Sequence, residues 1–388
     1  MSLTPPPLRS GSVPATASAA FRRGWGAYKQ NRRWILGYGL HALKNLAARR
    51  AAGPKHVLFS MCDHYEPLWG GAGAAQGRDR VARWEQEYPV LANEFRDADG
   101  RPPRHTFFFP GEQYSANYLA PLGRLARAGL GEVELHLHHD GDDASKLEHD
   151  IGSYVQAYAK HGLLARGKDG RPRYAFIHGN WCLANSRQDG KYCGVDSELG
   201  VLFDTGCYAD FTFPSAPDET QPRIVNQIYW PTGDPRRARS HETGVRARVG
   251  QVMADRILMI QGPLAVARRE GRLGLRIESA AVTARDPGTA RRMDTWISQS
   301  IHLEGRPEWL FVKAHTHGAP DAQATSLLGA PGRNMHRALR RYNDAKKFVL
   351  HYVSAREMFN IALAGMHGLR GDPNQFRDHL LPPPPVVT

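Results

Sequence analysis

Hydrophobic and polar positions alternate most regularly over residues 133–138, where three apolar residues are interleaved with Glu134, His136 and His138. A period of two is that of a β-strand, and it places the two sets of side chains on opposite faces. Imidazole and carboxylate groups at the end of a buried strand lose favourable hydration unless they are paired or bound to a metal. The pattern therefore predicts a strand that ends in a metal site. A solvated, acid-rich turn with hydrogen-bonded histidines is the alternative.

The same reading along the chain gives seven strands and the helices between them. The predicted strands are 56–60, 105–109, 133–138, 174–178, 208–213, 258–261 and 309–313. The predicted helices are 79–96, 115–128, 143–164, 196–205, 289–303, 335–348 and 355–366. Strands that alternate with helices are typical of a parallel sheet, so we expect a barrel-like α/β architecture.

Three regions follow from composition. Residues 1–52 combine a Pro-, Ser- and Ala-rich start, expected to be disordered, with a basic helical extension. Residues 53–320 hold the strand–helix alternation, and residues 321–388 add C-terminal helices that close the barrel and a Pro-rich tail. The chain is therefore expected to be one α/β body with an extension at each end.

The net charge of +13 is concentrated near the N-terminus, because ten Lys or Arg residues and no Asp or Glu precede Asp63. The rest of the chain is nearly neutral, which argues against a nucleic-acid-binding face on the body. Residues 21–50 are basic and partly apolar. We weigh three interpretations of them: a helix packed on the barrel, peripheral contact with an anionic membrane surface, and a transit peptide.

The four cysteines are spaced too irregularly for a zinc knuckle or a disulfide framework. We interpret them as reduced thiols, and no secretory signal is recognisable. These features predict a cytoplasmic protein, with association at the inner face of the membrane through residues 21–50 left open.

Polar residues gather where the predicted strands end, which is where barrel enzymes place their chemistry. The candidates are Asp63, His64, Tyr65, Glu66, Gln113, His136, His138, Asp140, His178, Asn180, Trp181, Asp210, His315 and His317. His178 taken alone is as well explained as a core histidine. The joint position at strand ends predicts a site that binds a divalent ion such as Zn, Fe, Mn or Co.

Three fragments carry a resemblance to the polysaccharide deacetylase (NodB-like) superfamily over residues of about 55 to 320. They are an Asp at the end of the first strand, a His cluster on the third, and a late His after an apolar strand. The segment Glu132-Val133-x-x-His136, followed by Asp140, stands where the family has Glu-Ile-x-x-His-x-x-x-His. The family's Asp-Asp pair is replaced by Asp63-His64, and its Arg-x-Pro-Tyr segment is absent.

The resemblance implies a distorted (β/α)7-type barrel and a metal-dependent enzyme that removes an acyl group, expected to be acetyl, from a sugar or glycan. The implied metal ligands are Asp63 or its neighbour His64, then His136, and then Asp140, with His138 as the alternative to Asp140. Asp63 or Glu66 would act as the base, and His317 or His315 would protonate the leaving group. The implied substrate contacts are Tyr65, Gln113, His178, Asn180, Trp181 and Asp210.

Two other functions stay open at this point. Amidohydrolases and PHP-type phosphoesterases are also barrel metallohydrolases with His-x-His pairs, although theirs usually lie on the first strand. The departures at the base and Arg positions also fit a glycan-binding barrel without catalysis.

Overall fold

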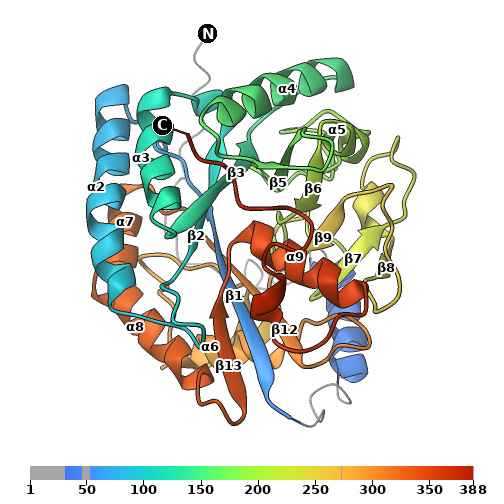
Figure 1. The fold of residues 1–388 in the computed structure, drawn as a ribbon. Coiled ribbons are helices and arrows are strands. Elements are labelled where there is room, and N and C mark those ends of the chain that lie inside the picture. The colour runs from blue at the N-terminus through green and yellow to red at the C-terminus, as the bar shows by residue number, and fades with distance from the viewer. Residues whose placement is uncertain (1–30, 46–52, 272, 388) are drawn as a thin grey trace, which may run out of the picture.

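The computed structural model describes residues 31–45, 53–271 and 273–387, which form a large, mostly parallel sheet with helices packed around it (Figure 1). Seven of the described strands form a parallel series in the order β12-β1-β2-β3-β5-β6-β9. They are β1 (Lys55–His64), β2 (His105–Pro110), β3 (Gly131–Leu137), β5 (Pro172–His178), β6 (Cys207–Asp210), β9 (Leu258–Ile260) and β12 (Trp309–Thr316). All seven predicted strands are confirmed, and the last of them pairs with the first.

Smaller strands extend this series. β7 (Ile228–Pro231) and β8 (Gly244–Arg246) continue it antiparallel beyond β9, and β4 (Ala165–Arg166) pairs with β5. β10 (Ala265–Arg268) and β11 (Leu275–Glu278) form a separate hairpin. β13 (Phe348–Tyr352) pairs in parallel with the first half of β1. The antiparallel strands and β13 were not predicted.

The longer helices cover the sheet in the way that strand–helix alternation requires. They are α2 (Ala74–Asn93), α3 (Ala116–Arg127), α4 (Ala144–Lys160), α5 (Glu198–Asp204), α6 (Ala290–Ser298), α7 (Asp321–Leu328), α8 (Ala330–Leu339) and α9 (Ala355–Met366). Short 3₁₀ turns are η1 (Gly111–Gln113), η2 (Ser240–Glu242), η3 (Arg340–Tyr342) and η4 (Pro373–Phe376). Asp143 and Thr289 cap α4 and α6 by accepting from backbone N–H groups that have no partner within the helix.

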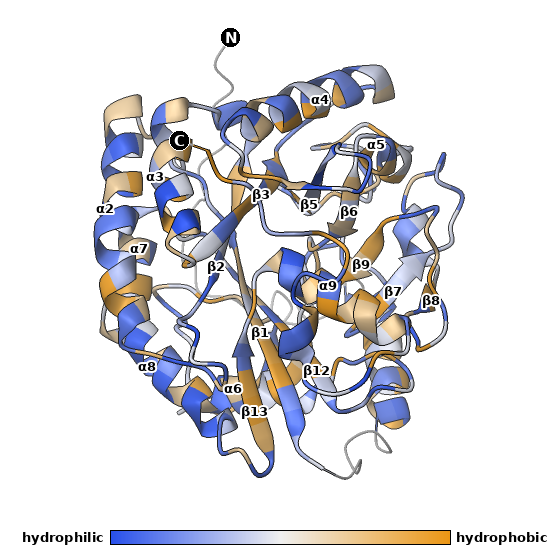
Figure 2. Cartoon of the chain, viewed as in Figure 1, coloured by the Kyte–Doolittle hydropathy of each residue, from blue (hydrophilic) through white to orange (hydrophobic). Residues whose placement is uncertain are grey.

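The alternation along each strand divides the core in two. On β1, Val57, Phe59 and Met61 pack with the helices outside the sheet, whereas Leu58 and Cys62 belong to a second cluster that includes much of α9. The apolar strands and the mixed helix surfaces can be followed in Figure 2. Burial of two apolar faces is the main stabilising contribution of such a sheet.

The C-terminal region is bound to the body by buried ion pairs. Arg356 of α9 donates to both carboxylate oxygens of Glu132 on β3, at 3.0 and 2.8 Å. The predicted helix over 335–348 was wrong at its end, because helical structure stops at Tyr342 and Phe348 begins β13. The Pro-rich tail lies against the molecule, where the Val387 N–H donates to the His161 carbonyl oxygen.

Residues 31–45 are helical, and one face of this helix packs against the body. Trp34 joins an apolar cluster with Val225 and Leu264, and Asn45 donates to the carbonyl oxygen of Gln299 at 2.9 Å. The rest of the basic extension, residues 21–30 and 46–50, lies outside the described residues.

Candidate metal centre

Glu66, just beyond the end of β1, is contacted by three histidines although it is only 1% exposed. Its Oε1 lies 3.1 Å from Nε2 of His136 and 2.8 Å from Nε2 of His138. Its Oε2 lies 3.1 Å from Nδ1 of His317. The donor atoms of Glu66, His136 and His138 lie within 4.8 Å of one another, so this group could hold a metal ion.

Strand pairing explains how these residues meet. His136 stands beside Pro110 of β2 and Ile177 of β5 in the parallel ladder, so it is fixed between two neighbours. Tyr65, which precedes Glu66, continues the pairing of β1 with β2 by donating its N–H to the carbonyl oxygen of Phe108. The carboxyl ends of parallel strands lie at one edge of a sheet, and this group forms there.

Each histidine of the group has a partner for its other ring nitrogen. Nδ1 of His136 lies 3.0 Å from the carbonyl oxygen of Ile177, which can only accept. Nδ1 of His138 lies 2.6 Å from Oε1 of Glu112 in η1. Both contacts place the proton on Nδ1 and direct Nε2 towards Glu66. Outer partners of this kind orient the histidine ligands of metal sites.

Burial and neighbouring charges shift the pKa values of Glu66, His136 and His138 in different directions. Burial alone would raise the pKa of Glu66, but the charge of His317 and the close contacts with His136, His138 and His317 hold that pKa well below its usual range. Burial lowers the pKa of His136. Burial also opposes the charged form of His138, yet Glu112 and Glu66 raise its pKa to about 10. The group therefore combines a carboxylate, a neutral imidazole and an imidazole held between two carboxylates.

Aromatic rings surround the group on the side where it reaches the surface. Trp69 and Trp181 lie with their ring centroids 5.0 and 6.0 Å from the His317 ring. The buried His64 ring lies 4.8 Å from His136 and 4.7 Å from His317, and neither of its nitrogens has a hydrogen-bond partner. Burial lowers the pKa of His64 well below its usual value. His64 is therefore a neutral ring beside the group.

Asp63 is directed away from this group. Its Oδ2 lies 2.8 Å from Nε2 of His105, and its Oδ1 accepts from the Gly318 N–H at 2.5 Å. Successive side chains of a strand point to opposite faces, so Asp63 and His64 cannot both face Glu66. A Cβ at Gly318 would collide with the Asp63 carboxylate, so this contact requires glycine. Asp63 thus links the ends of β1 and β12.

Other sequence candidates have contacts of their own. Asp140 accepts from the N–H of Tyr192 at 2.6 Å, and Gln113 accepts from the N–H of Leu68. Tyr65 is fully buried, with its ring 5.0 Å from Phe107. None of these three side chains contacts the Glu66 group among the described residues. Strand alternation turns Tyr65 to the side opposite Glu66, and their own loop contacts hold Asp140 and Gln113 away from it.

The remaining candidates lie on neighbouring strands and loops. Asp210 on β6 is buried and accepts from Thr212, and burial raises its pKa to about 7. His315 is buried on β12, 6.2 Å from the His64 ring. Asn180 donates its backbone N–H to Nδ1 of His178.

Two further groups of donor atoms could hold a metal ion. One consists of His139, His178, Cys193 and Glu198, beyond the ends of β3 and β5. The other consists of His56, His351 and Asp372, at the opposite end of β1. Glu112, His139, Cys193 and Glu198 were not among the sequence candidates. Glu112 lies three residues after the predicted strand 105–109 and could have been found. Cys193 and Glu198 give no signal, because they lie in and after a long irregular loop.

Compared with models of known protein families and with curated proteins, the chain matches none of them. The resemblance to polysaccharide deacetylases therefore rests on the sequence fragments alone. None of the described helices is long and apolar enough to cross a membrane. The fold and the site together define a mixed α/β protein with residue groups that could bind a metal ion.

Proposed function

We propose that the chain is a metal-dependent hydrolase that resembles polysaccharide deacetylases and removes an acyl group, expected to be acetyl, from a sugar or glycan. The metal would be held by Glu66, His136 and His138. His64, Asp63 and Asp140, which the sequence resemblance also offered as ligands, have no part in this set.

One observation carries the proposal. Nδ1 of His136 faces the carbonyl oxygen of Ile177, so its proton lies there and Nε2 presents a lone pair to Oε1 of Glu66 at 3.1 Å. Two acceptors at this distance repel unless a proton or a cation lies between them. Burial disfavours protonation of His136, so a metal ion is the better occupant.

The donor set also fits a catalytic site. Zinc usually takes four ligands, so two histidines and one glutamate leave one position open. Catalytic zinc sites keep such an open position, whereas structural sites have four protein ligands. The side chain of His138 is 28% exposed, so the group reaches solvent on one side. A metal bound here would polarise a carbonyl oxygen and lower the pKa of a bound water.

His317 is placed to transfer a proton. Its Nδ1 faces Oε2 of Glu66 at 3.1 Å, and no described residue makes a hydrogen bond with its Nε2. An imidazole oriented by a carboxylate suits the protonation of a leaving amine or alkoxide near neutral pH. Trp181 and Trp69 flank this ring and could stack on the apolar face of a sugar.

We further propose that the parallel series is a distorted (β/α)7-type barrel. The last strand, β12, already pairs with the first, and Gly262 after β9 lies against Lys313 of β12. A Cβ at Gly262 would collide with the carbonyl oxygen of Lys313, and the Gly262 N–H donates to Phe213. The two ends of the series therefore approach one another at this point.

The helix over residues 31–45 supports a proposal of peripheral contact with an anionic membrane. Leu36, Leu40 and Leu43 recur at helical spacing on the face opposite Trp34 and are 75%, 61% and 67% exposed. Arg32 and Lys44 are exposed on the same helix, in a region without acidic residues. An apolar stripe with basic neighbours is suited to an anionic lipid surface.

The reaction is tested by comparing two assays on the metal-loaded protein. We expect acetate release from an acetylated amino sugar or oligosaccharide, loss of that release on chelation, and recovery on metal return. Hydrolysis of a phosphate ester without acetate release would instead support a phosphoesterase barrel. Glycan binding with neither activity would overturn the hydrolase and leave a binding protein.

A further inference from the structure

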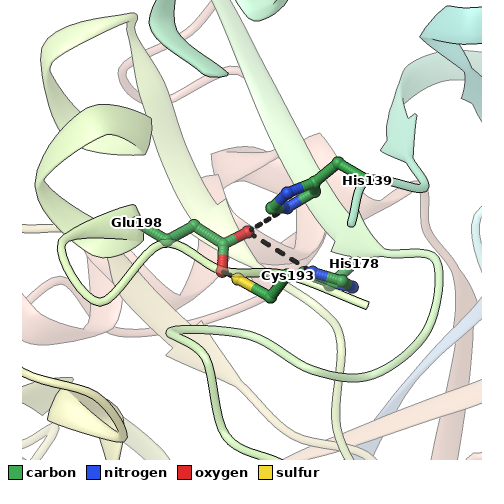
Figure 3. Close-up of side chains that lie close together, drawn as sticks. All are labelled: His139, His178, Cys193 and Glu198. Carbon is green, nitrogen blue, oxygen red and sulfur yellow. Dashed lines mark hydrogen bonds and ion pairs between the residues drawn. The ribbon is translucent and has the colours of Figure 1, made fainter. Parts of the chain in front are cut away.

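A second group of metal-binding side chains lies beside the candidate centre and is closed to solvent. His139 follows β3, His178 ends β5, Cys193 lies in the loop 179–197, and Glu198 begins α5. All four are buried, and Figure 3 shows their polar ends converging from these separate segments. Such a convergence of an imidazole pair, a thiol and a carboxylate is unusual for a core, because buried polar groups are costly unless matched.

The distances from the Glu198 carboxylate to the other three donor atoms are close to those between the ligands of a tetrahedral site. Oε1 of Glu198 lies 3.2 Å from Nε2 of His139 and 3.7 Å from Nε2 of His178, and its Oε2 lies 3.4 Å from Sγ of Cys193. The donor atoms all lie within 4.8 Å of one another. Zinc bonds of about 2.0 Å to nitrogen and about 2.3 Å to sulfur place tetrahedral ligands about 3.3–3.5 Å apart.

Residues outside the group lie close to two of its members, His139 and Glu198. Oε2 of Glu198 accepts from the Ala184 N–H at 2.6 Å, whereas Oδ2 of Asp142 lies 3.6 Å from Nδ1 of His139, too far for a hydrogen bond. A carboxylate behind a histidine is a common partner in zinc sites. Nε2 of His178 is fully buried and has no hydrogen-bond partner.

A metal bond to His178 would also depend on which ring nitrogen carries the proton. The Asn180 N–H donates to its Nδ1 at 3.2 Å, which places the ring proton on Nε2. A metal ion at Nε2 would require this proton to move to Nδ1, and the contact with the Asn180 N–H would then have to open.

We propose that His139, His178, Cys193 and Glu198 form a structural site for a divalent zinc-class ion. Four protein ligands and complete burial leave no position for substrate, which distinguishes this site from the open Glu66 group. Sulfur, nitrogen and oxygen donors together favour zinc over calcium or magnesium, which take oxygen ligands. The proposal does not depend on the proposed hydrolase activity.

The ion would fix the loop 179–197, which otherwise has little regular structure. Four of its non-glycine residues have positive φ angles: Trp181, Ala184, Asn185 and Tyr192. Such conformations cost on the order of 1 kcal/mol each and persist only where their surroundings impose them. Ligands at 178, 193 and 198 would hold both ends of this loop against β3. The same loop carries Trp181 to the His317 ring.

Cobalt substitution separates this site from the Glu66 group, because only this one contains sulfur. The purified chain is stripped with a chelator under reducing conditions, loaded with Co²⁺ and followed by near-ultraviolet absorption and metal analysis. We expect a thiolate-to-cobalt charge-transfer band in the wild type. Absence of that band in the folded wild type would overturn the proposal and leave a buried His139–Glu198 pair that needs no metal.

Two cysteine variants identify the ligand. Cys193→Ser should lose the band, whereas Cys182→Ser should keep it, since Cys182 is buried in the same loop but donates to the carbonyl oxygen of Asn180. A band that survives Cys193→Ser would contradict the assignment. If Cys193→Ser does not fold, His178→Gln should keep the band but weaken cobalt binding by more than about 10-fold. Unchanged affinity in His178→Gln would also overturn the site.

Discussion

Nε2 of His138 lies 2.8 Å from Oε1 of Glu66, at the point where the ends of β1 and β3 come together. The other nitrogen of this ring lies 2.6 Å from Oε1 of Glu112, after β2. One imidazole thus links carboxylates from two neighbouring strand ends. In the proposed centre Glu66 would act as a ligand, and Glu112 would orient the His138 ring from outside.

Glu112→Gln tests whether Glu112 orients His138 while Glu66 binds the metal. The amide can still accept from Nδ1 of His138, but it lacks the charge that favours the Nδ1 proton, so metal affinity should fall about 10–100-fold. Competition with a chelator measures this affinity. Gln113→Ala is the matched control, because Gln113 is the next residue of η1 and accepts from Leu68 instead. Equal losses in both variants would contradict an orienting role for Glu112.

His317→Gln tests the proposed proton donor. If His317 protonates the leaving group, kcat for deacetylation should fall about 10²–10⁴-fold while bound metal is retained. His315→Gln is the comparison, because His315 is the other donor offered by the sequence and is buried away from the Glu66 carboxylate. A larger loss of kcat in His315→Gln than in His317→Gln would reverse the assignment.

The fold was largely predictable, because the seven parallel strands are short apolar runs separated by helical patterns. β13 was missed for a physical reason. The segment Phe348–Tyr352 is a short, mostly apolar run, which fits a helix or a strand equally well without a tertiary partner. Its partner, the first half of β1, lies almost 300 residues earlier in the chain.

Glu134 gives a prediction on pH-dependent stability. It is buried on β3, where it accepts from Tyr208 and from the Ala175 N–H, and burial raises its pKa from 4.5 to about 8. The folded state therefore binds more protons than the unfolded state between these values. The stabilising contribution is complete below pH 4.5 and is lost as pH rises through 8.

Glu134→Gln should remove this dependence, because an amide can accept from Ala175 and donate to the Tyr208 oxygen without titrating. Urea unfolding of both proteins across this pH range gives the difference in the free energy of unfolding. We expect the wild type to lose stability relative to the variant as pH rises, by on the order of 5 kcal/mol. Parallel curves for the two proteins would show that Glu134 does not titrate in this range.

Leu40→Glu tests membrane contact through the helix over residues 31–45. Placing a charge in the exposed Leu36–Leu43 stripe should reduce sedimentation with vesicles of anionic phospholipid, and neutral vesicles should bind less in every case. Leu275→Glu is the control, since Leu275 is 64% exposed on the β10–β11 hairpin. Equal vesicle binding by wild type and Leu40→Glu would exclude this surface.

The site was less predictable than the fold. Alternation predicts His136 and His138 on one side of the chain, and both rings contact Glu66 at the end of β3. The same rule, applied to β1, separates Asp63 from His64, and Asp63 contacts His105 instead. The position of Glu66 depends on the turn after β1. A turn has no repeating hydrophobic pattern, so this position could not be predicted from periodicity. Cys193 and Glu198 reach their partners through an irregular loop, so only the three-dimensional arrangement reveals them.

The most direct test of the central claim is metal analysis of the purified chain beside its His136→Ala variant. We expect His136→Ala to bind about one equivalent of metal less than the wild type after reconstitution. The variant should remain folded and keep the cobalt–thiolate band of the separate cysteine site. Asp140→Asn should match the wild type, because Asp140 contacts the Tyr192 N–H rather than the Glu66 group. Full metal content in folded His136→Ala would contradict a centre at Glu66, His136 and His138.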